Sequence, residues 1–241
     1  ELITSHKRRE IDPLVFIIDK GSSHRMLAEF FDADITIFNY DEQMPFTPFR
    51  GHYDKQKIFF LTNLICSAVE LTSPSFQIES EHKTAIAKSI KNAYLSKCKK
   101  SGLTYIDGEL LIKDNQFEVL LQMEDIISEL GSLSEKESES IREIVEPLLL
   151  KLRPFYQDGV YARFFKGQAC KTEDQSSFYL YDLDAISNDL TLQTLLTMSV
   201  TEEIRRILCL KENRDRESFL ILKDFATLGR NNPIFKDYVD H

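Results

Sequence analysis

Four apolar residues followed by a charged pair form the part of the sequence best suited to chemistry. Phe219–Leu222 (FLIL) predicts a buried strand, and Lys223 and Asp224 follow it directly. Ligands of open α/β sheets bind at the carboxyl ends of the strands, so a carboxylate there can hold the shell of a Mg²⁺ ion. A Glu at the next position would orient an attacking water. The alternative is an acid that ends a strand for structural reasons, which is the more frequent case.

A second candidate site follows the first predicted strand. Val15–Asp19 (VFIID) ends in an acid, and Gly21, Ser22 and Ser23 come next. Asp19 and Ser22 are candidate nucleotide-binding residues, because a strand end and a helix start can face a phosphate together. The structural alternative is that Asp19 caps the strand and that a serine caps the following helix.

The elements that would position these residues alternate between strand and helix at both ends of the chain. We expect a helix from Arg25 to Phe31 and a strand at Asp34–Tyr40, and then a helical stretch over 55–151. Within it, Gly131 would end one helix and a capping box at Ser134 would open the next. The expected later elements are strands at Val160–Phe165, Phe178–Leu183 and Phe219–Leu222, and a helix at Leu190–Leu210.

This order predicts an α/β fold with a mostly parallel sheet and a large all-α insertion. The expected boundaries are 1–54 for the first α/β part, 55–153 for the helical insertion and 154–241 for the second α/β part.

Composition excludes several classes of protein. The 241 residues include 39 acidic and 30 basic side chains, a net charge of −9, which argues against non-specific nucleic-acid binding. No run of roughly 18 apolar residues is present, so no transmembrane helix is expected. The four cysteines and five histidines are scattered, so neither a metal site nor a disulfide framework is predicted.

Five segments together resemble a known family, the conjugative-transfer and type IV secretion pilus-assembly ATPases of the TraC type. The first segment, FIIDKGSSHRML (Phe16–Leu27), is similar to the IDxGxSxxxL segment of the family, and the last, FLILKDFATLGR, falls where the family carries Walker B. The three between them are Pro45–Phe49, Gly159–Gly167 and Phe178–Ile186 (FYLYDLDAI). Their order and spacing cover nearly the whole chain.

The resemblance implies a RecA-like fold of the P-loop NTPase type, with ATP and Mg²⁺ as cofactors of the parent protein. It implies ATP hydrolysis that powers pilus assembly or type IV secretion. It also implies a homo-oligomer, a hexamer in the family, in the bacterial cytoplasm and peripheral to the inner membrane. The implied partners are inner-membrane components of the secretion system, and no direct contact with nucleic acid is expected.

Two departures from the family concern catalysis. The chain has no GxxxxGK[ST] phosphate loop. Lys223 stands where the family has its magnesium-binding Asp, and Asp224 stands where it has the catalytic Glu; a slip of one position would put Phe225 there instead. A further strand that follows Walker B in the family is also missing. The chain is therefore expected to be a truncated fragment that binds no nucleotide and hydrolyses no ATP alone.

Two alternatives remain open. DFATLGR (224–230) resembles the DEFxxLGR segment of DNA-pumping coupling ATPases of conjugation. The chain could also be a non-enzymatic interaction module, left from a decayed ATPase gene, in which the helical insertion binds a partner.

Overall fold

The computed structural model describes residues 13–40, 44, 47–51, 54–100, 105–106, 109–110, 119–136, 138–166, 176–210, 213 and 215–223. The described chain divides into two compact units. Residues 13–44 and 176–223 form the first, a sheet unit, and residues 47–166 form the second, a helical unit.

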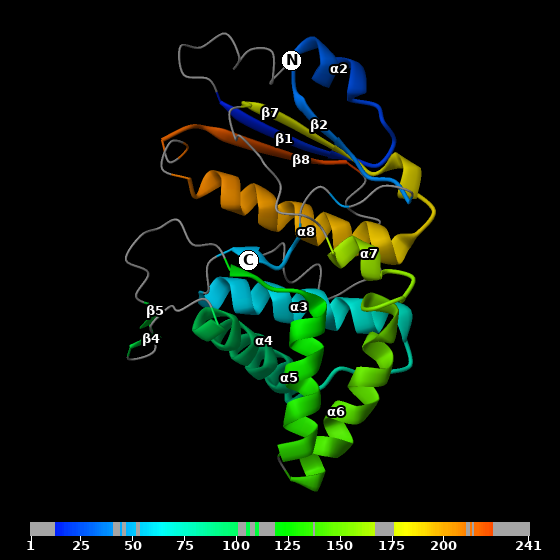
Figure 1. Cartoon of the computed structure of the whole chain (residues 1–241). Helices are drawn as coiled ribbons and strands as arrows, with labels where there is room; N and C mark the ends of the chain where they lie inside the picture. Colours follow the sequence, from blue (N-terminus) through cyan, green and yellow to red (C-terminus); the bar gives the residue numbers. More distant parts are fainter. Residues whose placement is uncertain are drawn as a thin grey trace. The chain divides into compact units, whose positions relative to one another are not determined.

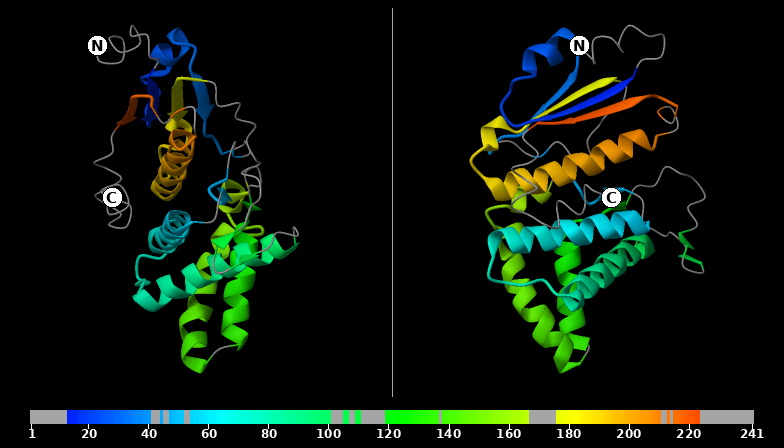
Figure 2. Two further views of the ribbon diagram at one scale, coloured as in Figure 1. Left: turned by 90° about the vertical axis from the view of Figure 1, so that its left-hand side faces the viewer. Right: turned by 180° about the vertical axis from the view of Figure 1, so that it is seen from behind.

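The sheet unit has four strands in the order β2-β7-β1-β8. They are β1 (Leu14–Asp19), β2 (Asp34–Ile37), β7 (Phe178–Asp182) and β8 (Ser218–Leu222). Every neighbouring pair is parallel. Helix α2 (Arg25–Phe30) lies over one face of the sheet and α8 (Leu190–Leu208) along the other (Figure 1, Figure 2). A short 3-10 helix, η2 (Asp184–Ile186), links β7 to α8. The predicted α/β class with a mostly parallel sheet is confirmed.

Strand β1 lies between β7 and β8, and all six of its residues are buried. Val15 and Ile17 join a hydrophobic cluster that includes Ala28 of α2. On the opposite face the Phe16 ring stacks on Tyr179, with 5.0 Å between ring centroids. A strand covered on both faces has no polar side, which is why its sequence is a continuous apolar run.

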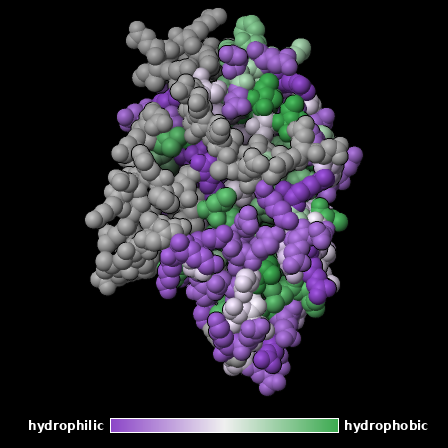
Figure 3. Space-filling view, in the orientation of Figure 1, coloured by the Kyte–Doolittle hydropathy of each residue, from purple (hydrophilic) through white to green (hydrophobic). Residues whose placement is uncertain are grey.

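The helix α8 begins where Asp189 accepts a hydrogen bond from the backbone N–H of Leu192, at 2.9 Å. Its apolar residues from Leu192 to Val200 are buried. The short α2, in contrast, leaves Met26 and Phe30 largely exposed, and hydrophobic surface is visible over this helix in the space-filling view (Figure 3).

The helical unit is built from four long helices with short strands beside them. The helices are α3 (Lys55–Thr72), α4 (Ser80–Lys100), α5 (Met123–Lys136) and α6 (Glu139–Leu152). Two antiparallel pairs accompany them: β3 (Arg50–Gly51) with β6 (Val119–Leu120), and β4 (Tyr105–Ile106) with β5 (Glu109–Leu110). The 3-10 helix η1 (Arg153–Phe155) and the short α7 (Ala162–Phe165) complete it. Within the described ranges, no helix is both long enough and apolar enough to span a membrane.

The predicted strand at Val160–Phe165 is wrong, because Ala162–Phe165 forms α7. The chain turns back at Gly159, where the backbone lies so close to Arg153 and Pro154 that a Cβ would clash with their carbonyl oxygens. The N–H of Tyr161 then donates to the carbonyl of Pro154 at 2.8 Å, and the Tyr161 ring stacks on Phe155. The aromatic residues that suggested a strand are those that hold this turn.

The predicted helix boundary between Gly131 and Ser134 is also wrong. Both residues lie inside α5, and α6 begins after Ser138. Glycine within a helix costs about 1 kcal/mol relative to alanine. The burial of Leu130 and Leu133, on either side of Gly131, outweighs this cost because each apolar side chain contributes roughly 1.5–3 kcal/mol.

The covered position of β1 can be tested with a matched pair of substitutions. Ile17→Val in β1 should lower the free energy of unfolding by about 1 kcal/mol, since it removes a methylene from a fully buried site. Ile37→Val in the edge strand β2, where the side chain is 38% exposed, should lower it by less than about 0.5 kcal/mol. Urea unfolding followed by circular dichroism measures both. Equal losses would contradict the central position of β1.

Candidate functional site

The carboxyl ends of three parallel strands bring the candidate residues together. Asp19 ends β1, Asp182 ends β7, and Lys223 follows β8. Asp19 and Asp182 are direct neighbours in the register of β1 with β7. The N–H of Lys223 donates to the carbonyl of Ile18 at 3.1 Å. Parallel pairing alone therefore places two acids and one lysine at the same edge of the sheet.

The Asp19 carboxylate is fully buried and accepts hydrogen bonds from the turn that follows it. Its Oδ1 accepts from the N–H of Gly21 at 3.0 Å. Its Oδ2 accepts from the hydroxyl of Ser23 at 3.0 Å and from the N–H of His24 at 2.9 Å. The Nδ1 of the His24 ring also lies 2.9 Å from Oδ2. The carboxylate thus organises the turn from residue 20 to residue 24.

These contacts set the ionisation of Asp19. Burial by itself would raise the pKa of the carboxyl group. The hydrogen bonds from the backbone of Gly21, from the ring and backbone of His24 and from Ser23 outweigh that effect, and they hold the pKa of Asp19 well below its ordinary value. Asp19 is therefore a carboxylate throughout the physiological pH range.

Lys223 supplies the positive charge of the site. Its Nζ lies 3.6 Å from Oδ1 of Asp19 and donates to the hydroxyl of Ser23 at 2.6 Å. The lysine side chain is 34% exposed, so the charge pair lies at the mouth of the site. The ammonium occupies the position at Asp19 that a bound cation would need.

Ser22 is hydrogen-bonded to Asp182, the second acid of the site. Its hydroxyl donates to Oδ2 of Asp182 at 2.7 Å, and its φ angle is 48°. This left-handed conformation costs a residue other than glycine about 1–2 kcal/mol, so the hydrogen bond to Asp182 has to hold it. The other oxygen of Asp182 accepts from the N–H of Asp184 at 2.9 Å, which is the turn-forming role usual for an aspartate after a strand.

The expected serine cap of the first helix is wrong. The helix α2 begins after His24, and no side chain caps it. Ser23 donates to Asp19 instead, because the carboxylate is buried and needs every donor in reach. Asp224 lies outside the described residues, whereas Asp19, Ser22 and Lys223 lie together.

Two contributors to the site were not singled out as such by sequence reasoning. His24 belongs to a set of scattered histidines, and Asp182 and Asp184 could form a carboxylate pair, although an aspartate after a strand more often forms a turn. The available signal was positional. His24 follows Asp19 by five residues across a Gly-Ser-Ser turn, and Asp182 ends a second apolar run, so the carboxyl ends of two parallel strands had to meet.

The described residues of this edge do not fit a Mg²⁺ ion. Mg²⁺ needs oxygen ligands at about 2.0–2.1 Å in an octahedral arrangement. Both oxygens of Asp19 and both oxygens of Asp182 already accept hydrogen bonds from the chain, and the ammonium of Lys223 would repel a cation beside Asp19. In the described part of the chain, no group of three or more His, Cys, Asp or Glu side chains could hold a metal ion.

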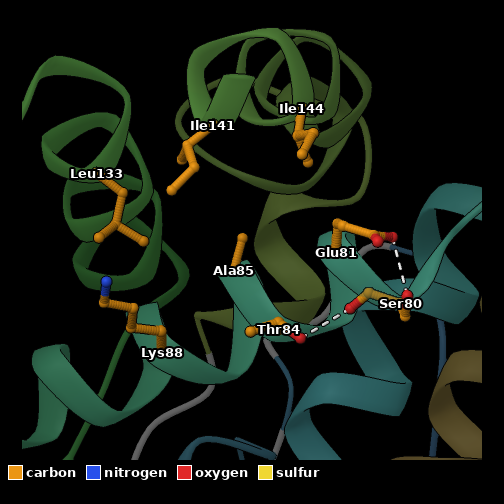
Figure 4. A pocket seen from close by; sticks show the side chains of 8 residues that line it. All are labelled: Ser80, Glu81, Thr84, Ala85, Lys88, Leu133, Ile141 and Ile144. Atoms are coloured by element: carbon orange, nitrogen blue, oxygen red, sulfur yellow. Dashed lines mark hydrogen bonds between the residues drawn. The ribbon is translucent and has the colours of Figure 1, made fainter. Parts of the chain in front are cut away.

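A separate groove lies in the helical unit, between α4, α5 and α6 (Figure 4). Its volume is about 380 Å³, within the range of ligand sites. Aliphatic side chains form its walls, and polar or charged side chains surround them. The lining residues are Ala85, Leu133, Ile141 and Ile144, with Ser80, Glu81, Thr84 and Lys88. In Figure 4, Glu81 and Lys88 lie toward opposite ends of the groove.

Comparison with solved structures finds chains of similar fold. The protein is similar to one of them, VirB4 of Thermoanaerobacter pseudethanolicus, with a TM-score of 0.67 over 99% of this chain and 82% of that one. The sequence identity is 14%, so the likeness establishes the fold. No protein-family model and no curated protein matches the chain. The expected α/β fold with a mostly parallel sheet and a large helical insertion is confirmed by this likeness.

The lowered pKa of Asp19 predicts how stability depends on pH. Because the pKa is lower in the folded than in the unfolded chain, the contribution of Asp19 to stability is complete above its ordinary value near pH 4 and is lost as the pH falls below it. Asp19→Asn should lower the free energy of unfolding by about 2 kcal/mol at pH 7, and by clearly less at pH 3. Urea unfolding at both pH values measures the difference.

Glu29→Gln is the control, since Glu29 lies in the same unit with a side chain that is 60% exposed. It should change the free energy of unfolding by less than about 0.5 kcal/mol at either pH. If wild type and Asp19→Asn differed by the same amount at pH 7 and pH 3, the carboxylate would not be the titrating group.

Proposed function

We propose that the chain is part of a type IV secretion ATPase, of the kind that powers conjugative pilus assembly, and that it does not hydrolyse ATP by itself. Two observations support the relationship. The chain has the fold of VirB4 along 99% of its length, and five sequence segments stand in the order in which pilus-assembly ATPases carry them. The proposal that the chain does not hydrolyse ATP by itself rests on the residues at the carboxyl edge of the sheet.

The contact of Lys223 with Asp19 is the observation that supports the proposed loss of ATP hydrolysis. A nucleotide site of this fold needs Mg²⁺ to bridge the phosphates and a carboxylate to hold it. Here a lysine follows the strand where that carboxylate belongs, and its ammonium is bound to Asp19 and Ser23. The sequence also offers no GxxxxGK[ST] loop whose backbone N–H groups could bind the β- and γ-phosphates.

The same relationship supports a proposal for the cellular setting of the protein. We place it in the bacterial cytoplasm, at the inner membrane, in a homo-oligomer that is a hexamer in the family. Inner-membrane components of the secretion system are its proposed partners. ATP and Mg²⁺ belong to the parent family, and this chain alone is proposed to bind neither.

The net charge of the chain, −9, disfavours direct contact with nucleic acid. A DNA-pumping coupling ATPase, suggested by DFATLGR, would need a basic DNA-binding surface.

The groove of the helical unit favours a second candidate function, that of a non-enzymatic interaction module. Its aliphatic walls and its opposite charges at Glu81 and Lys88 suit an amphipathic helix that carries one basic and one acidic residue. The two groove residues are seven positions apart on α4, about 10 Å along the helix axis. A partner helix with apolar residues between two opposite charges at the same spacing would match them.

The absence of a working nucleotide site predicts the response to Mg-ATP and to Mg²⁺ alone. Calorimetric titration of the wild-type chain with Mg-ATP should give no binding heat up to about 1 mM. Lys223→Asp replaces the ammonium beside Asp19 with a second carboxylate. Mg²⁺ at 10 mM should therefore raise the melting temperature of this variant and leave that of the wild type unchanged.

Lys91→Asp makes the same charge change on an exposed position of α4 and should show no Mg²⁺-dependent shift. Micromolar binding of Mg-ATP by the wild-type chain would rule out the proposed inactivity.

The interaction alternative predicts binding of a synthetic helical peptide with three leucines flanked by one Lys and one Glu seven residues apart. Ile144→Lys in the groove should weaken its binding at least tenfold, because the substitution places a charge among the aliphatic walls. Val160→Lys, at a position in the same unit that is 73% exposed and does not line the groove, should leave it unchanged. Fluorescence anisotropy of the labelled peptide measures both. Similar affinities for the two variants would exclude the groove as the binding site.

A further inference from the structure

A second groove of the helical unit lies between α5 and α6. Its volume is about 460 Å³, and it shares no lining residue with the groove of Figure 4. Ile127 and Gly131, one helical turn apart on α5, line it from one side. Apart from the backbone of α5 itself, no atom of the described residues lies within 4 Å of the position that a Cβ of Gly131 would take. The groove is therefore open where a longer side chain of α5 would fill it.

The other side of the groove is one face of α6 and of its C-cap residue. Four lining residues stand at positions i, i+3, i+4 and i+7, which share a face of a helix: Glu146, Leu149, Leu150 and Arg153. Leu149 is half-buried, and Leu150 is 57% exposed. The residues of α6 that are completely buried in the unit form a different stripe: Val145, Leu148 and Leu152. The helix thus carries an outward pair of leucines in addition to the stripe that its own core uses.

Opposite charges flank this leucine pair. Glu146 and Arg153 are seven positions apart, about 10 Å along the helix axis. The side chain of Glu146 is 62% exposed, and its Oε1 lies 3.9 Å from Nε of Arg142, a surface contact that contributes little to stability. Before Pro147, α6 has three glutamates and one arginine, and after Pro147 it has one lysine, which Arg153 follows. The first part of the helix is therefore negative and its end is positive.

We propose that this face of α6 binds the same face of a second copy of the chain, with the two helices antiparallel across a two-fold axis. In such a contact each residue meets its counterpart reciprocally. An axis between Leu149 and Leu150 places Glu146 of each copy opposite Arg153 of the other, because both residues are equally far from that midpoint. The leucine pairs of the two copies meet at the axis, and the open groove beside Gly131 gives them room.

The charge pattern is what favours a second copy over a different protein. Two ion pairs enclose an apolar centre, and the chain itself carries the complement of its own face at the required spacing. The negative part of each α6 also lies along the positive end of the other. This inference does not rest on the proposed function. A hexameric ring is built from head-to-tail contacts, which a two-fold contact does not supply, and the test below uses neither nucleotide nor Mg²⁺.

Sedimentation velocity of the full chain measures the dissociation constant of the dimer. A contact of this small size binds weakly, so we expect a Kd of about 10–100 µM for the wild type. Glu146→Arg and Arg153→Glu each set like charges opposite one another at both ends of the contact and should raise the Kd at least tenfold. An equimolar mixture of the two variants should associate with a Kd within threefold of the wild-type value. In that heterodimer one glutamate again lies opposite one arginine at each end.

Glu29→Arg is the matched control. The side chain of Glu29 is 60% exposed, and like Glu146 it contacts an arginine four positions before it in the same helix. This substitution should leave the Kd of the dimer unchanged. Leu150→Ser tests the apolar centre separately and should raise the Kd at least threefold, since it removes exposed leucine surface from the contact.

Three results would overturn the proposal. A wild-type chain that stays monomeric up to about 200 µM would leave the face to a different protein. Equal dissociation constants for the wild type, Glu146→Arg and Arg153→Glu would place self-association at another surface. Failure of the two charge variants to associate when mixed would exclude the antiparallel two-fold arrangement.

Discussion

The burial of one carboxylate governs the functional edge of the sheet. Asp19 has no exposed surface, and an isolated charge in such a place would be shifted to its neutral form. It stays ionised because the chain bends around it: the backbone of Gly21 and His24, the hydroxyl of Ser23 and the ring of His24 all approach its oxygens. The turn after β1, the start of α2 and the end of β8 are therefore fixed by a single group.

The need of the buried Asp19 carboxylate for partners also determines which ligand chemistry is possible at this edge. A carboxylate at the end of a parallel strand can take its positive partner either from a bound cation or from the protein. In this chain the protein supplies it, since Lys223 reaches Asp19 from the neighbouring strand. Asp182 is likewise satisfied by Ser22 and by the N–H of Asp184. The strand ends lie together as they do at ligand sites of open α/β sheets. The carboxylate oxygens at these ends, however, already accept hydrogen bonds from the chain itself.

Much of the fold was predictable, because it follows from apolar patterns. The runs VFIID, FYLYD and FLIL became β1, β7 and β8, and the stripe of leucines after Asp189 became α8. The failures occurred where tertiary contacts outweigh local preference. VYARFF has the composition of a strand, but the stacking of Tyr161 on Phe155 holds it in a turn and a short helix. At the site, the meeting of Asp19 with Lys223 could be anticipated only from strand order, which a single sequence does not specify. Ser23 donates to Asp19 because that carboxylate is buried, and no local sequence pattern reveals the burial.

The residues that hold the fold of this chain differ from those at the carboxyl edge of its sheet. The sheet is held by residues on its two faces, such as Ile17 toward α2 and Phe16 against Tyr179. Ligand chemistry depends on residues at the strand ends, which contribute little to those faces. A substitution such as lysine for an acid after β8 can therefore leave the fold intact, provided that the new charge finds a partner, and Asp19 provides one. A TM-score of 0.67 at 14% identity is what such a division predicts. The apolar layers preserve the architecture, and function has to be argued from the residues at the edge.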